Sequence, residues 1–138
     1  MTTGRILIVD DNATNLKLAC DLLEMEGFVV LRAVTAEEAV TVIGTAMPEL
    51  ILMDIELPGT DGLTLTRRLK NNPATRSIPV VAMTAFAMKG DDVKAFEAGC
   101  EGYITKPIDT RTFPGQVSRF LRSRDGSESS TGPTPPSH

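Results

Sequence analysis

The chain has 138 residues, the usual size of one domain, and its hydrophobic fraction of 41% is sufficient for one packed core. Its formal net charge is -4 and no run of Lys and Arg forms a cationic stripe, so nucleic acid is not an expected partner. The N-terminal apolar run is too short for a signal peptide or a membrane span, which predicts a soluble cytoplasmic protein with no membrane partner.

Five short apolar runs alternate with helical patterns along the chain, as expected for an α/β protein with a parallel sheet covered by helices on both faces. The first four runs are nearly uninterrupted, which is typical of buried parallel strands. The predicted strands are residues 6–9, 29–33, 50–53, 80–83 and 103–105.

Each strand is followed by a predicted helix. Thr35 with Glu38 three residues later forms a capping-box pattern at the start of the second helix. Gly27 and Gly99 suit the ends of the first and fourth helices. The predicted helices are residues 13–26, a segment after Thr35, about 62–70, about 89–98, and a fifth that begins near Thr112 or with a distorted turn, because Pro114 and Gly115 disfavour a helix interior.

The composition changes near the C-terminus. Residues 123–138 are dominated by Ser, Gly, Pro and Thr and have no apolar residue that could join a core. The predicted domain is therefore residues 4–122, followed by a disordered tail at 123–138. A linker toward an output domain has the same composition, and a stand-alone domain is the default interpretation.

The cysteine and histidine pattern excludes other classes of site. Cys20 and Cys100 form no CxxC pair, and His138 is the only histidine, so neither a zinc site nor a disulfide framework is predicted. Each cysteine is expected to pack as a small buried side chain. Asp61 and Asp109 are assigned to capping and turn roles.

Polar side chains follow four of the predicted strands. They are Asp10 and Asp11 after the first strand, Asp54 after the third, Thr84 after the fourth, and Lys106 with Pro107 after the fifth. Because ligands of an open parallel sheet bind at the carboxyl ends of its strands, these side chains are expected to converge. Three carboxylates repel one another unless a cation is bound, and their oxygens suit magnesium. With a lysine and a hydroxyl nearby, the pattern predicts a phosphoryl-transfer site.

The stretches ILIVDDN, ILMDIELPGTDG, VVAMTA and GYITKP occur in this order at the ends of the predicted strands. Over residues 4–122 the chain resembles the receiver domains of two-component response regulators. The resemblance implies a flavodoxin-like, doubly wound sheet of five parallel strands in the order 2-1-3-4-5 with five helices. It also implies a signalling switch that accepts a phosphoryl group from a histidine kinase or a histidine phosphotransfer protein, and that catalyses only its own phosphorylation and dephosphorylation.

The resemblance also implies a role for each matching residue. Asp54 is the expected phosphoacceptor. Asp11 is expected to ligate Mg²⁺, with Mn²⁺ as a substitute, Asp10 to ligate it directly or through water, and the backbone carbonyl of Glu56 to be a further ligand. Lys106 is expected to pair with the phosphoryl group, and the peptide bond between Lys106 and Pro107 to be cis.

The remaining implied roles concern the response to phosphorylation. Thr84 and Ala85 are expected to contact the phosphoryl group, and Thr84 and Tyr103 to form the switch. Movement of Tyr103 would change the face made by the fourth helix, fifth strand and fifth helix, where an unknown downstream protein binds. Glu56 and Phe86 flank the site in sequence and are expected to tune the lifetime of the acyl phosphate.

Four alternative functions compete with the receiver interpretation. An aspartyl-phosphate phosphohydrolase would carry a second Asp two residues after the nucleophile, where this chain has Glu56. A flavin or nucleotide binder would have a Gly-rich loop after the first strand. A pure interaction module would not need Asp54, Thr84 and Lys106. A phosphorelay intermediate or hybrid-kinase receiver stays open as the alternative form of the same function.

Overall fold

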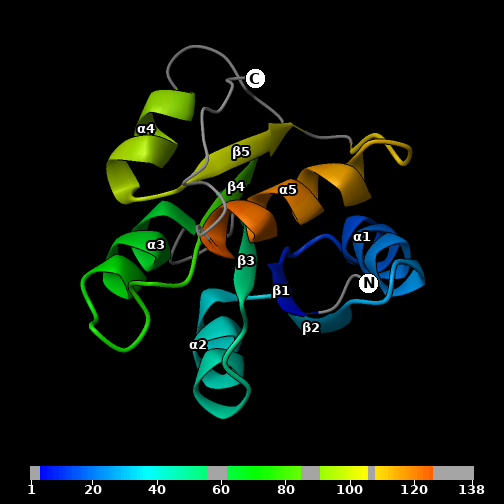
Figure 1. Ribbon diagram of the computed structural model, residues 1–138. Coiled ribbons are helices and arrows are strands. Elements are labelled where there is room, and N and C mark those ends of the chain that lie inside the picture. The colour runs from blue at the N-terminus through cyan, green and yellow to red at the C-terminus, as the bar shows by residue number, and fades with distance from the viewer. Residues whose placement is uncertain (1–3, 56–61, 85–90, 106–107, 126–138) are drawn as a thin grey trace.

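The computed structural model describes residues 4–55, 62–84, 91–105 and 108–125, which form one parallel five-stranded sheet with five helices (Figure 1). The strand order is β2-β1-β3-β4-β5, so the predicted fold class and order are confirmed. The strands are β1 (Arg5–Val9), β2 (Val29–Ala33), β3 (Leu50–Asp54), β4 (Val80–Thr84) and β5 (Gly102–Thr105). The helices are α1 (Ala13–Met25), α2 (Ala36–Thr45), α3 (Gly62–Lys70), α4 (Asp91–Ala98) and α5 (Phe113–Asp125).

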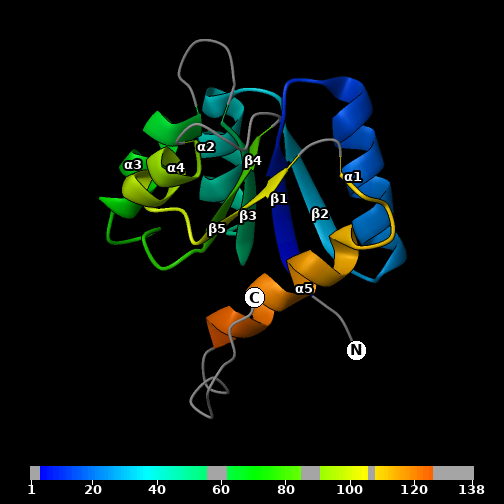
Figure 2. The same ribbon diagram turned by 90° about the horizontal axis from the view of Figure 1, so that it is seen from above.

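Helices cover both faces of the sheet, which explains why the central strands are apolar at successive positions. Figure 2 shows α1 and α5 on one side of the strands and α2, α3 and α4 on the other. Along β1, Leu7 and Val9 belong to the apolar cluster beneath α2, α3 and α4. Ile6 and Ile8 belong to the cluster beneath α1 and α5. Alternate side chains of one strand therefore support opposite helical layers.

The helix ends follow the predicted capping chemistry. The Thr35 hydroxyl accepts a hydrogen bond from the Glu38 amide at 3.0 Å, and the Glu38 carboxylate accepts one from the Val34 amide at 2.8 Å. Gly27 and Gly99 follow α1 and α4 with φ of 98° and 111°, in the left-handed region that favours glycine. Among the helices of the described ranges, none combines the length and apolar composition needed to cross a membrane.

Helix α5 begins at Phe113, as expected from the residues around it. The Asp109 carboxylate accepts a hydrogen bond from the Arg111 amide at 2.9 Å, which confirms its predicted turn role. Pro114 lies in the first helical turn, where the missing amide hydrogen costs little. The described helix continues to Asp125.

Both cysteines are free and buried, as predicted. Burial raises the pKa of the Cys20 thiol, and it raises the pKa of the Cys100 thiol to about 11. At neutral pH both side chains are therefore neutral thiols. They contribute to packing and have little thiolate with which to react.

A network centred on Lys70 joins α3 to the amino ends of two strands. The Lys70 ammonium donates hydrogen bonds to the carbonyl oxygens of Arg76 and Ile78, at 3.2 and 2.7 Å, and to the Glu101 carboxylate at 3.2 Å. The other oxygen of Glu101 accepts a hydrogen bond from the Val80 amide at 2.8 Å. One ammonium thus connects the end of α3, the segment before β4 and the segment before β5.

We predict that Lys70→Met lowers the free energy of unfolding by about 1–3 kcal/mol, because the partly buried Ile78 carbonyl, the exposed Arg76 carbonyl and the Glu101 carboxylate lose their donor. The measurement is urea unfolding followed by circular dichroism. Lys17→Met is the matched control, since Lys17 pairs with Asp21 at 3.0 Å on the surface, where both side chains are largely exposed. That change is expected to cost at most about 0.5 kcal/mol. Equal effects of the two changes would contradict the prediction.

Candidate functional site

Asp10 and Asp11 continue directly from β1 at the carboxyl edge of the sheet. The Asp10 amide donates to the Ala33 carbonyl at 3.1 Å, which extends the β1–β2 pairing by one residue. The Asp10 Oδ1 atom accepts a hydrogen bond from the Asn12 amide at 2.9 Å, and the Asn12 side chain in turn accepts one from the Asn15 amide at 3.0 Å. Asn12 is therefore the N-cap of α1 and also helps to orient Asp10.

Asp54 and Thr84 are the last residues of β3 and β4, whereas the sequence placed them just after these strands. Asp54 is in register with Met83, and Thr84 is in register with Thr105. Both side chains are almost fully buried, at 2% and 1% exposure. The strand ladder reaches these residues because their neighbours supply backbone partners, so their backbones are fixed by the sheet.

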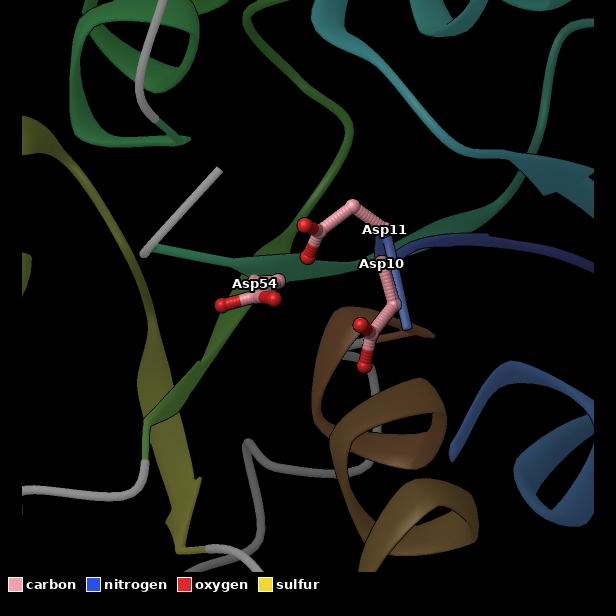
Figure 3. Close-up of side chains that lie close together, drawn as sticks. All are labelled: Asp10, Asp11 and Asp54. Carbon is pink, nitrogen blue, oxygen red and sulfur yellow. The ribbon is translucent and has the colours of Figure 1, made fainter. Parts of the chain in front are cut away.

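The carboxylates of Asp10, Asp11 and Asp54 gather at the ends of β1 and β3 (Figure 3). One oxygen from each lies within 4.8 Å of the others, which confirms the predicted convergence of these three residues. Oxygens that share one Mg²⁺ lie roughly 3–4 Å apart, so small side-chain rotations would suffice to bind it. Asp10 and Asp54 are buried and Asp11 is exposed, which leaves one side of the cluster open to solvent. The donor set fits a divalent cation that prefers oxygen ligands.

Gly62 permits α3 to begin against the backbone of Asp54. A Cβ atom at Gly62 would collide with the Asp54 carbonyl oxygen and would lie 2.9 Å from the Ile55 Cα atom. These are backbone atoms of the last residue of the central strand and of the residue that follows it, so they have little freedom to move. The absence of a side chain at Gly62 is therefore a condition for placing α3 beside the candidate site.

Tyr103 is half-buried and packs on the same apolar cluster as Ala82 of β4. Its ring meets the ring of Phe96 from α4 in an edge-to-face arrangement. Phe96 was missed in the sequence because it lies off the buried face of α4. Asn12 and Gly62 were also missed as site residues, although an Asn before a helix and a Gly at its start are recognisable signals.

Several residues with predicted roles, at the site or, for Asp61, in a helix cap or turn, lie outside the described part of the chain. They are Glu56, Asp61, Ala85, Phe86, Lys106 and Pro107. The proposed metal contact of the Glu56 carbonyl, the cis peptide bond, the lysine–phosphoryl pair and the rate-tuning roles therefore stay predictions.

Comparison with known proteins gives a consistent result. A family model described as response regulator receiver domain matches residues 6–117. The polar-differentiation response regulator DivK of Brucella ovis is 44% identical over 119 residues, which cover 86% of this chain and 97% of the relative.

Two solved structures agree with the observed fold. A CheY-like receiver domain protein of Methanospirillum hungatei is 30% identical with a TM-score of 0.82, covering 91% of this chain and 98% of that one. The receiver domain of a histidine kinase from Syntrophus aciditrophicus is 34% identical with a TM-score of 0.79, covering 87% and 91%.

We predict that Gly62→Ala lowers the free energy of unfolding by roughly 1–3 kcal/mol, because the new methyl group overlaps the β3 backbone. Gly44→Ala is the matched control, since a Cβ atom at this position in α2 meets nothing within 4 Å. That change should raise stability by about 0.5 kcal/mol, the usual helical preference for alanine. Urea unfolding of the two variants tests the difference in sign, and a stable Gly62→Ala variant would contradict the close approach.

We also predict that Mg²⁺ raises the melting temperature of the protein, and that Asp11→Asn weakens this response by roughly tenfold or more in Mg²⁺ concentration. Without Mg²⁺ the same change should not lower the melting temperature, because it removes one of three mutually repelling charges. Asp21→Asn, an acidic position on α1 outside the cluster, is the control. An unchanged Mg²⁺ midpoint in Asp11→Asn would exclude the carboxylate cluster as the cation site.

Proposed function

Because the chain belongs to the response regulator receiver family of two-component systems, we propose that Asp54 accepts a phosphoryl group from a phosphohistidine in a Mg²⁺-dependent step. The observation that supports this most directly is the gathering of Asp10, Asp11 and Asp54 at the carboxyl edge of the sheet. The donor is a histidine kinase or a histidine phosphotransfer protein. The chain is a cytoplasmic signalling protein that catalyses only its own phosphorylation and dephosphorylation.

Asp54 is positioned to act as a nucleophile. Its carboxylate oxygen attacks the phosphorus, the bond between phosphorus and the donor imidazole nitrogen breaks, and an acyl phosphate forms on Asp54. The ladder of β3 and β4 holds the Asp54 backbone, so little ordering of the nucleophile is needed. When bound, a divalent cation supplies positive charge between the carboxylates and the incoming phosphoryl oxygens. Asp10 and Asp11 are the residues that would hold it.

Thr84, Ala85 and Lys106 complete the proposed contacts to the phosphoryl group. The Thr84 hydroxyl lies at the end of the neighbouring strand and can donate one hydrogen bond. Lys106 follows β5 and supplies a positive charge. Glu56 and Phe86 each follow a site residue by two positions in the sequence, and they tune the access of water to the acyl phosphate.

The output of this switch is a change of the face formed by α4, β5 and α5. Thr84 moves toward the phosphoryl group and Tyr103 turns into the space that it leaves, which alters the surface offered to a downstream protein. Val93 and Phe96, two exposed apolar side chains of α4, belong to this surface. Their exposure suits a partner that buries apolar area on binding.

The relatives support a protein-binding output. The match covers 97% of DivK from Brucella ovis, so that relative consists almost entirely of the matching domain.

The second candidate is a receiver that passes its phosphoryl group to a further histidine. It is favoured by the likeness to a receiver domain of a histidine kinase from Syntrophus aciditrophicus, at the lower identity of 34%.

We predict that a small phosphodonor such as acetyl phosphate adds one phosphoryl group to the wild-type protein in the presence of Mg²⁺, and that chelation of Mg²⁺ abolishes the addition. Asp54→Asn should stay unmodified, because the amide is not a nucleophile toward phosphorus. Intact-protein mass spectrometry measures both. Asp21→Asn is the control and should be modified as the wild type is. Labelling of Asp54→Asn, or labelling indifferent to chelation, would refute the assignment.

A further inference from the structure

The contact between Phe96 and Tyr103 is the one ring pair within the described part of the chain. The ring centroids are 6.3 Å apart and the ring planes meet at 76°. This is the edge-to-face geometry that aromatic rings prefer, because the positive edge of one ring faces the negative face of the other. Phe96 is 49% exposed, so its ring is held on one side by Tyr103 and is open to solvent on the other.

Phe96 and Thr84 belong to different elements beside Tyr103, α4 for Phe96 and β4 for Thr84. Tyr103 is in register with Ala82, whereas Thr84 is two residues further toward the carboxyl edge, a distance of about 7 Å along the strand. Phe96 lies in the last turn of α4, close in sequence to the residues that lead into β5 at the amino edge. A Tyr103 ring that keeps its contact with Phe96 is held against α4, and it must give up this contact to turn toward the end of β4.

We propose that Phe96 is a positioning residue that stabilises Tyr103 in its present position against α4 and thereby opposes the switch. The proposal rests on the Thr84–Tyr103 switch of the proposed function, and it adds a residue that shifts the equilibrium between the two positions of the Tyr103 ring. A ring pair of this kind shifts an equilibrium between two positions by roughly two- to tenfold. Phosphorylation of Asp54 has to overcome that bias before Tyr103 can turn.

Because Phe96 is partly exposed on α4, a partner that binds there can affect the equilibrium of the Tyr103 ring. A partner that changes the Phe96 ring position also changes the stability of the Tyr103 contact. By linkage, the state of Asp54 then alters the affinity of such a partner, and the partner alters the apparent affinity of the site for a phosphoryl group by the same factor.

The chain offers a direct test, because it contains one tyrosine and no tryptophan. Intrinsic fluorescence and its quenching by acrylamide therefore report on Tyr103 alone. The probe is beryllofluoride with Mg²⁺, a stable analogue of the acyl phosphate. In Phe96→Leu and Phe96→Ala, the beryllofluoride concentration at the midpoint of the Tyr103 signal should fall by roughly two- to tenfold, because the opposing contact is lost. The starting signal should also lie closer to the saturated value.

Val40→Ala is the matched control, since Val40 is an exposed apolar residue of α2, outside the face of α4, β5 and α5, and is 44% exposed. It should keep the wild-type midpoint, and urea unfolding should show that all variants are folded. A midpoint in both Phe96 variants that equals or exceeds the wild-type value would overturn the proposed role of Phe96. A wild-type protein that binds beryllofluoride at Asp54 without any change in the Tyr103 signal would overturn the switch itself, and the role of Phe96 with it.

Discussion

The mutual repulsion of three carboxylates at one edge of the sheet is the constraint to which the other parts of the structure respond. Asp10 and Asp54 are buried, and a buried charge is costly unless a partner compensates it. The sheet supplies rigidity, since both residues continue the backbone pairing of neighbouring strands. Asp11 is exposed and gives solvent and ions access to the cluster. This combination of fixed backbone and clustered negative charge favours chemistry in which cations and anionic groups arrive together.

The two edges of the sheet carry different interactions, repulsive at the carboxyl edge and stabilising at the amino edge. At the carboxyl edge, acidic residues are held close at an electrostatic cost. At the amino edge, Lys70 and Glu101 join α3 to the segments before β4 and β5 through several hydrogen bonds. Stabilising contacts at one edge can offset the repulsion at the other without touching the reactive residues. Such a separation is common in proteins whose functional sites are locally unfavourable.

The sequence predicted the five strands and the convergence of Asp10, Asp11 and Asp54, because both follow from apolar periodicity and from the rule that parallel strands end at one edge. It did not predict the Phe96–Tyr103 contact or the Lys70–Glu101 pair. These contacts join segments that are distant in the sequence, and no periodic pattern encodes them. Helical periodicity can indicate which side of a helix is buried, but packing decides which exposed ring meets Tyr103. The predicted ends of β3 and β4 were one residue short of the observed ends, Asp54 and Thr84, for the same reason: where a strand ends depends on its pairing with the neighbouring strand.

The hydrogen bond from the Asn12 amide to Asp10 has a consequence for the choice of cation. One of the two Asp10 oxygens already accepts this hydrogen bond, so chelation of an ion by both oxygens of this carboxylate would compete with the bond that orients it. Calcium favours large coordination shells and often takes both oxygens of a carboxylate, whereas magnesium takes single oxygens in a compact octahedron and retains several waters. Asp10 as it is held here would thus suit a cation bound through a single carboxylate oxygen, as magnesium is, better than one that takes both oxygens, as calcium often does.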